Sequence, residues 1–310
     1  MNDITTTERI LSEDLLKHVY SCQQNGHRPT ITSIAGALQI SPNEATLLVT
    51  KMADHNLLHL EDAEIYLTSG GQDYALQIIR AHRLWERYLA DETGFHEAEW
   101  HDRADQQEHS LSPAEVEALS ARLGHPTHDP HGDPIPTAKG HFVPHGGHPL
   151  TTLKNGNSAR IVHLEDEPPI VYAQLVAEGL CPGLEIRLTE ISPQRVCFWA
   201  DGKEHILAPI VASNISVLPL KQPVEIEHLE RLSSLKIGEK GQVVNISPAC
   251  RGAERRRFMD LGILPGTVIK AEMVSPSGDP TAYRIRQALI GLRKEQADYI
   301  NISSEVKETN

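Results

Sequence analysis

The stretch "HDRADQQEH" at residues 101–109 concentrates side chains that can bind a metal ion. On a helix, His101, Asp105, Glu108 and His109 stand at i, i+4, i+7 and i+8, which is one face. This face carries no apolar residue, so it is not a core stripe. It is either a metal-binding surface or a solvated polar face of a helix.

A second pair of such side chains precedes this stretch. His82 and Glu86 stand at i, i+4 within the amphipathic segment 71–94. Two adjacent antiparallel helices would direct these groups and those of the later stretch into a shared space. A divalent cation needs oxygen and nitrogen ligands that converge from several elements. By spacing alone, metal binding and a solvated face are equally well supported.

Composition limits the classes of protein to consider. The chain has 310 residues, 39% of them hydrophobic, which suits a globular protein of two to four domains. The net charge of −13 argues against a surface covered with basic patches. The sequence contains no apolar run long enough to cross a membrane and its N-terminus lacks the plan of a signal peptide. We therefore expect a cytoplasmic protein without membrane insertion.

The first 70 residues show the order of elements found in a winged helix-turn-helix domain. A helix over 12–24 with Ser12 as its N-cap is followed by two short helices, "ITSIAGALQI" and "EATLLVTKMADHNLL", joined at "SPN". "LLHLEDAEIYLTSGG" then alternates apolar residues on both sides of an acidic turn, as a β-hairpin does. We assign residues 1–70 to this domain.

Residues 71–136 are predicted to form an all-α domain. Helices are expected over 71–94, 97–109 and 112–124, the last with Ser112 as N-cap. The first of them has more apolar side chains than one helical layer hides, so we expect a homodimer formed through this region. Residues 137–149 are rich in His, Pro and Gly and read as a linker.

The remainder of the chain contains an internal repeat. "LTTLKNGNSARIVHL" at 150–164 resembles "LSSLKIGEKGQVVNI" at 232–246, and the corresponding Gly179 and Gly262 stand 83 positions apart. Each copy reads as a strand, a short helix, a glycine-rich turn and further strands, which indicates a small antiparallel barrel. We place the two barrels at 150–220 and 228–304. The predicted fold class is multidomain α+β.

The chain resembles the diphtheria toxin repressor family of metal-dependent transcription regulators over residues 12 to about 136. The resemblance is carried by "LTSGGQDYALQIIRAHRLWERYL", "WHDRADQQEHSLSPAEVEAL" and "PHGDPIP", in the family's order and spacing. It implies a winged helix-turn-helix domain, a helical dimerisation domain with SH3-like barrels behind it, and two metal positions near the junction of the first two.

The resemblance also implies a ligand set. His82, Glu86 and His101 match the ligands of one metal position, and Asp105, Glu108 and His109 match the other, to which Asp14 of the first helix is added. Asp14 also suits the first turn of a helix simply through the helix dipole. Every candidate ligand is oxygen or imidazole, which favours Mn²⁺ or Fe²⁺ as the cofactor, Mn²⁺ more. Lys17 stands where the manganese branch has an acidic residue, and its side chain could occupy the space of a neighbouring cation.

The expected DNA-reading helix is poor in positive charge. Between Thr30 and Ile79, Lys51 is the only basic residue against six acidic ones, while phosphate neutralisation supplies much of DNA-binding affinity. Arg28, Arg80 and Arg83, with Arg87, are candidates to compensate. The predicted DNA contacts are Ser41, Asn43, Thr46, Thr50 and Lys51.

The last unit resembles the FeoA family of SH3-like barrels associated with ferrous iron uptake. "RRRFMDLGILPGTVI" and "SPSGDPTAYRIRQALIGLRKEQADYI" carry the match, and residues 150–220 form a weaker copy with "GLCPG" and "ISVLPL". This unit is basic where the rest of the chain is acidic. Its basic surface is either solvated or contacts an acidic partner, DNA or the acidic winged-helix domain of its own chain.

Two hypotheses of function follow. The first is a metal-dependent DNA-binding regulator of manganese or iron homeostasis, acting as a homodimer on double-stranded operator DNA. The alternative is a metal-sensing interaction protein with impaired DNA binding, which acts through its FeoA-like units on an iron transporter or another partner. An enzyme is not expected, because the chain has no HExxH motif, nucleophile elbow or P-loop.

Overall fold

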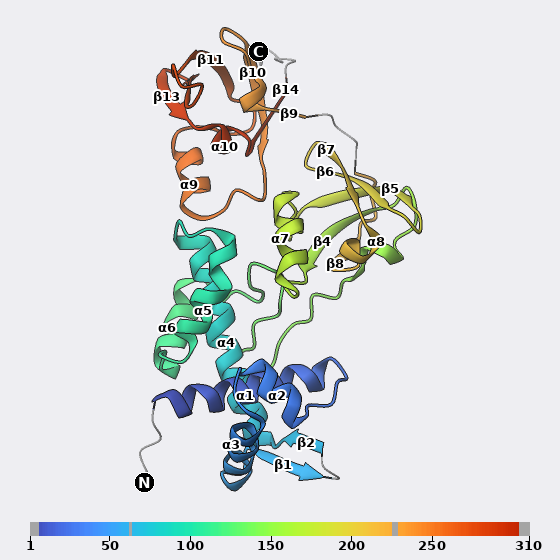
Figure 1. The fold of residues 1–310 in the computed structure, drawn as a ribbon. Coiled ribbons are helices and arrows are strands. Elements are labelled where there is room, and N and C mark those ends of the chain that lie inside the picture. Colours follow the sequence, from blue (N-terminus) through green and yellow to red (C-terminus); the bar gives the residue numbers. More distant parts are fainter. Residues whose placement is uncertain (1–5, 62–63, 225–228, 304–310) are drawn as a thin grey trace. The chain divides into compact units, whose positions relative to one another are not determined.

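The computed structural model describes residues 6–61, 64–224 and 229–303 (Figure 1). The chain divides into two compact units. The first contains residues up to 89 together with 96–129 and 133–144, and the second contains 90–95, 130–132 and the residues from 145 onward. The first unit is mainly helical and the second is built on two antiparallel sheets, so the fold is a mixed α/β multidomain one.

The first unit begins with three helices and a hairpin, in the predicted order. They are α1 (Thr6–Gln24), α2 (Ile31–Ala37), α3 (Pro42–Asp54), β1 (Leu58–Glu61) and β2 (Glu64–Leu67). Leu15, Leu16 and Ile34 are fully buried between the helices. α3 starts at a capping box in which Ser41 accepts a hydrogen bond from the Glu44 backbone N–H. The acidic turn expected between the strands falls partly on residues 62–63, outside the described residues.

The start predicted for α1 is wrong. The helix begins at Thr6, and Ser12 lies buried in its second turn instead of capping it. The Ser12 hydroxyl donates a 2.8 Å hydrogen bond to the Glu8 carbonyl inside the helix. A serine can satisfy its hydroxyl in this way within a helix, so its presence before an apolar run does not by itself mark a helix start.

Three further helices complete the first unit: α4 (Ser69–Glu92), α5 (Trp100–Glu108) and α6 (Pro113–Arg122). The segment 97–99, expected at the start of α5, forms a separate 3-10 turn. The predicted N-cap of α6 is confirmed, since Ser112 accepts a hydrogen bond from the Glu115 backbone N–H. α6 packs on α4 through Leu84 and Val116, and Ile135 of the following extended segment joins that core.

The apolar surface of α4 is already covered within the chain. Leu76, Ile78, Leu84 and Leu89 are all 5% exposed or less, and Trp85 is only partly exposed. Most of the apolar surface expected for a partner is therefore buried within the chain, while Ile79 and Trp85 stay partly exposed. The homodimer through residues 71–124 remains a prediction.

Each half of the second unit contains one six-stranded antiparallel sheet. The elements of the first are β3 (His148–Pro149), β4 (Ser158–Leu164), α7 (Pro169–Ala177), β5 (Glu185–Ile191), β6 (Val196–Ala200), β7 (Lys203–Leu207), α8 (Pro209–Ala212) and β8 (Ile215–Pro219). Its strand order is β3-β8-β4-β5-β6-β7. The last two residues of the predicted linker, 148–149, thus belong to this sheet.

The second sheet repeats this arrangement. Its elements are β9 (Glu230–Arg231), β10 (Lys240–Ile246), α9 (Gly252–Asp260), β11 (Val268–Val274), β12 (Thr281–Ile285), β13 (Ala288–Leu292), α10 (Lys294–Ala297) and β14 (Ile300–Ser303). The strand order, β9-β14-β10-β11-β12-β13, is the same when the two sheets are read from corresponding edges.

The internal repeat is confirmed down to its irregularities. The register shifts between Ile161 and His163 in β4 and between Val243 and Asn245 in β10, which are equivalent positions. The turn glycines also correspond, because Gly179 and Gly262 have φ of 76° and 81°. A bulge and a left-handed glycine in the same places show that the two copies share one backbone plan. Within the described residues, no helix is long and apolar enough to cross a membrane.

Gly71, at the start of α4, has no room for a side chain. A Cβ on Gly71 would lie 1.9 Å from the Leu57 carbonyl oxygen, whereas a Cβ on Gly70 would meet nothing closer than 3.8 Å. We expect Gly71→Ala to destabilise the first unit by about 1–3 kcal/mol, because backbone must move. Gly70→Ala serves as the control and should cost nothing, since alanine favours a helix. Chemical denaturation measures both, and equal stabilities would contradict the prediction.

Candidate metal centre

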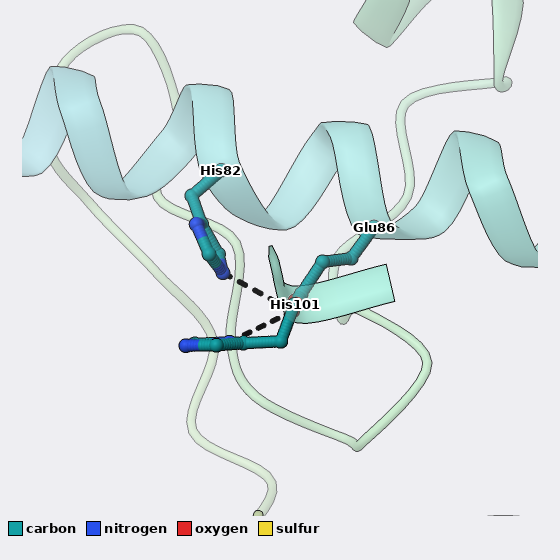
Figure 2. Close-up of side chains that lie close together, drawn as sticks. All are labelled: His82, Glu86 and His101. Atoms are coloured by element: carbon teal, nitrogen blue, oxygen red, sulfur yellow. Dashed lines mark hydrogen bonds and ion pairs between the residues drawn. The ribbon is translucent and has the colours of Figure 1, made fainter. Parts of the chain in front are cut away.

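Three helices of the first unit bring the predicted ligands together. His82 and Glu86 project from consecutive turns of α4, and His101 meets them from α5 (Figure 2). Glu86 Oε1 lies 3.1 Å from His82 Nε2 and 3.3 Å from His101 Nδ1. The i, i+4 spacing on α4 produces the pair, and α5 adds the third group.

A second group of ligands forms where α1 meets the end of α5. His109 Nε2 lies 3.2 Å from Asp14 Oδ1 and 3.5 Å from Glu108 Oε1. One potential ligand atom of each of these three residues lies within 4.8 Å of the others. The structure therefore places Asp14, which the resemblance implies as a ligand, beside Glu108 and His109.

Asp105 and Glu108 connect the two groups. His82 Nδ1 lies 2.6 Å from Glu108 Oε2 and 3.2 Å from Asp105 Oδ1, while its Nε2 faces Glu86. His82 is thus shared between both groups. All seven predicted ligands occupy one continuous cluster on α1, α4 and α5.

Burial decides against a solvated helix face. The side chains of Glu86 and Glu108 are 2% and 0% exposed, and that of His109 is 8% exposed. Asp105 and His101, at 46% and 50%, face solvent more. A buried carboxylate is costly unless cations or hydrogen-bond donors compensate it. This face of α5 is consequently a polar interior, open on one side.

Glu13 is a member of the site that the sequence did not reveal. Its carboxylate accepts a 2.6 Å hydrogen bond from His109 Nδ1 and a 2.7 Å bond from the Tyr74 hydroxyl, and it pairs with Arg9 at 3.1 Å. The bond to Nδ1 leaves Nε2 of His109 directed at Asp14 and Glu108. A carboxylate behind a histidine in this way fixes the ring for metal binding. Only burial on α1 distinguishes Glu13 from other acidic residues.

Lys17 enters the cluster from α1. Its Nζ donates to Glu108 Oε1 and Oε2 at 2.7 and 2.9 Å and to Asp105 Oδ1 at 3.2 Å. Burial would lower the pKa of Lys17, but the charges of Glu108 and Asp105 outweigh it and raise the pKa. The lysine is charged at neutral pH.

The histidines of the cluster hold protons tightly without a metal. Burial lowers the pKa of His109, but hydrogen bonds to Asp14 and Glu13 outweigh it and raise the pKa to about 9. The hydrogen bond to Glu86 raises the pKa of His101 despite its burial. A metal ion binds imidazole only after the proton leaves, so metal binding here releases protons.

The donor set fits a hard or borderline divalent cation. The clusters contain only carboxylate oxygens and imidazole nitrogens, and no thiol belongs to them. Oxygen and imidazole ligands suit Mn²⁺ and Fe²⁺, while thiolate-rich sets select softer ions. The residues that could hold a cation are His82, Glu86 and His101 in one group, and Asp14, Asp105, Glu108 and His109 in the other.

The predicted DNA contacts lie on and around α3. Asn43, Thr46 and Thr50 are exposed along one side of α3, together with Leu47, which is 59% exposed and was not predicted. Ser41 is occupied as the N-cap of α3, and Lys51 forms an ion pair with Glu8. The free positive charge of this surface is therefore lower than its sequence suggests.

Two of the four arginines expected to compensate, Arg80 and Arg83, hold elements of the first unit together. Arg80 is 8% exposed and donates to the Pro136 carbonyl and Glu117. Arg83 donates to the Pro134 carbonyl and Asp133, and Arg28 pairs with Glu64 although its own side chain is 79% exposed. Arg80 and Arg83 thus tie the extended segment to α4 and are not offered to a phosphate backbone.

Two segments of the chain match known protein families. Residues 68–137 match the family model of the iron dependent repressor metal binding and dimerisation domain, and residues 230–304 match the FeoA domain. The iron-dependent repressor IdeR of Mycobacterium leprae is 27% identical over 227 residues, which cover 67% of this chain and 95% of that protein. IdeR of Mycobacterium bovis is 30% identical over 171 residues, 55% of this chain and 71% of that protein.

A solved structure agrees with these relatives. A manganese-dependent transcriptional repressor in complex with manganese superposes with a TM-score of 0.62 at 28% identity. The superposition covers 67% of this chain and 100% of that one. These two relatives and this neighbour are named as iron- or manganese-dependent repressors and not as enzymes.

We expect removal of one buried charge to weaken metal binding. Glu86→Gln should lower the affinity for Mn²⁺ at least tenfold, about 1.4 kcal/mol, because Glu86 lies between both histidines of its group. Glu99→Gln is the matched control, since Glu99 pairs with Arg103 at the surface of the same region. Calorimetric titration with Mn²⁺ measures the effect. Unchanged affinity in Glu86→Gln would show that this group does not bind the ion.

The proton on His109 provides a pH test. In the metal-free protein His109 should titrate near pH 9, well above the ordinary value of 6.5. A raised pKa stabilises the folded state below about pH 6.5, and this stabilisation is lost as pH rises through about 9. Glu13→Gln should lower the titration midpoint, because it removes one of the two carboxylates that bind the imidazolium. Histidine NMR of chelator-treated protein measures both midpoints, and identical midpoints would refute the role given to Glu13.

Proposed function

This chain belongs to the iron-dependent repressor family, and from that premise we propose that it is a cytoplasmic, metal-dependent DNA-binding regulator of manganese or iron homeostasis. Its effector would be Mn²⁺ or Fe²⁺. The observation that carries the proposal is the convergence of α1 with α4 and α5 on one cluster of carboxylates and imidazoles.

The cluster links the part of the chain that would read DNA to the part that would dimerise. Asp14 and Lys17 come from α1, which packs against α2 and α3, while His109 and Glu108 come from α5. A cation bound to this cluster adds positive charge to it, and α1 reaches the cluster through Asp14 and Lys17. If the cation binds more tightly when α1 is held against α5, its binding would fix the angle between α3 and the dimerisation helices.

This mechanism needs a DNA-reading domain and a dimerisation domain. We propose that α1, α2, α3 and the β1–β2 hairpin form a winged helix-turn-helix domain, with α3 as the recognition helix. The two six-stranded sheets would be SH3-like barrels of the FeoA type. A homodimer through residues 71–124 would place its two α3 helices in successive major grooves of an operator. The exposed contacts would then come from Asn43, Thr46 and Thr50, with Ser41 and Lys51 at the two ends.

The low free positive charge around α3 favours a second candidate function. Lys51 and Arg28 are paired with Glu8 and Glu64, and Arg80 is buried. A metal-sensing interaction protein that binds DNA weakly, and acts through its FeoA-like units on an iron transporter or another protein, would need no more positive charge than this.

A gel-shift titration against the DNA upstream of the chain's own gene tests the proposal. We expect a shifted complex with Mn²⁺ or Fe²⁺ and none after chelation, and we expect Glu86→Gln to need more metal for the same shift. Asn43→Ala should weaken the complex without changing metal affinity. If no DNA is bound with either metal while metal affinity is intact, the interaction-protein function takes its place.

The salt dependence of the complex should be shallow. A site that neutralises few phosphates loses affinity with a slope of about −0.9 per phosphate on logarithmic axes, so we expect roughly −2 to −4 for a dimer. Fluorescence anisotropy between low and physiological salt gives the slope. A slope near −8 would mean that basic residues outside α3, such as those of the second FeoA-like unit, reach the DNA.

A further inference from the structure

Lys17 has a place inside the candidate metal centre that the family's function does not explain. We propose that its ammonium group is a built-in cation which replaces one metal ion, so that each subunit binds a single divalent cation, at His82, Glu86 and His101. This inference rests on the proposed metal-dependent function and specifies how that site is regulated.

The geometry of Lys17 is that of a ligand-sharing cation. Its Nζ lies within 3.2 Å of three oxygens, two from Glu108 and one from Asp105. Those two carboxylates, with His82, form one of the groups whose ligand atoms lie close enough to hold an ion. The ammonium thus makes, to the same oxygens, the contacts that a metal ion would make.

Lys17 also affects the group of Asp14, Glu108 and His109, because it binds Glu108. Glu108 belongs both to the group with Asp105 and to the group with Asp14 and His109. Both of its oxygens already accept hydrogen bonds from Lys17, and Oε2 accepts a third from His82. A divalent ion at Asp14 and His109 would compete for a saturated carboxylate and be repelled by the ammonium a few ångströms away.

Burial makes this charge necessary in the metal-free protein. The Glu108 side chain is fully buried, so an uncompensated carboxylate there would be strongly destabilising. Lys17, itself 24% exposed, supplies the compensation from α1. Lys17 thus joins α1 to α5 through its hydrogen bonds to Glu108.

The remaining group is free of this competition. His82 Nε2 and His101 Nδ1 face Glu86, and neither of these two nitrogens contacts the carboxylates that Lys17 holds. His101 meets Asp105 through its other nitrogen, Nε2, at 3.5 Å. His82 faces Lys17's carboxylates with its other nitrogen, Nδ1. One cation can thus bind there while Lys17 stays in place.

The number of Mn²⁺ ions bound per subunit tests the inference. Equilibrium dialysis of the full chain with Mn²⁺ should give one bound ion per subunit for the wild type. Elemental analysis measures total Mn²⁺, and electron paramagnetic resonance measures free Mn²⁺. Lys17→Gln should give two, because Asp105 and Glu108 lose their cation and become available. Lys17→Arg, which keeps the charge, should stay at one. Lys51→Gln, a lysine of α3 that pairs with Glu8 outside the cluster, should also stay at one.

Each outcome separates this inference from the proposed function. Two ions of similar affinity in the wild type would overturn it, even if Lys17→Gln does not fold. One ion in a folded Lys17→Gln would overturn it as well, because Lys17 would not limit the stoichiometry. No bound Mn²⁺ or Fe²⁺ in the wild type would overturn the metal-dependent function itself.

Discussion

The first unit depends on how the buried Glu108 carboxylate is compensated. This side chain has no exposed surface, and its partners come from two other helices: Lys17 from α1 and His82 from α4. A buried charge without such partners would cost more than most core contacts return. The positions of α1, α4 and α5 relative to one another are thus tied to the charge state of a single polar cluster, which is what a metal-responsive protein requires.

The same principle accounts for the scarcity of free positive charge elsewhere in the first unit. Arg80 and Arg83 bind carbonyls of the segment 134–136, and Lys51 pairs with Glu8. Basic side chains that would contact phosphates in a strong DNA-binding protein are here used to join elements of one chain.

The tandem sheets show one backbone plan with two different surfaces. Strand order and bulges coincide, but α7 carries Ile170, which is 81% exposed, where α9 carries the arginine run at 255–257. Arg255 is partly used internally, since it donates to the carbonyls of Ile246, Ser247 and Cys250. Packing conserves the inner faces of both sheets, while nothing in the fold constrains what the two helices present outward.

The sequence by itself determined the order of elements and the repeat, and helical spacing indicated six of the seven candidate ligands, because such spacing and turn glycines are local properties. It also indicated Asp14 and the ambiguity of Lys17. Only the tertiary structure decided that Glu108 is buried and bound by both Lys17 and His82, that Glu13 accepts a hydrogen bond from His109, and that Arg80 donates to the Pro136 carbonyl. These facts arise where side chains far apart in the chain meet, as Lys17 and Glu108 do across 91 positions. Burial and pairing are properties of that meeting, so no local pattern encodes them.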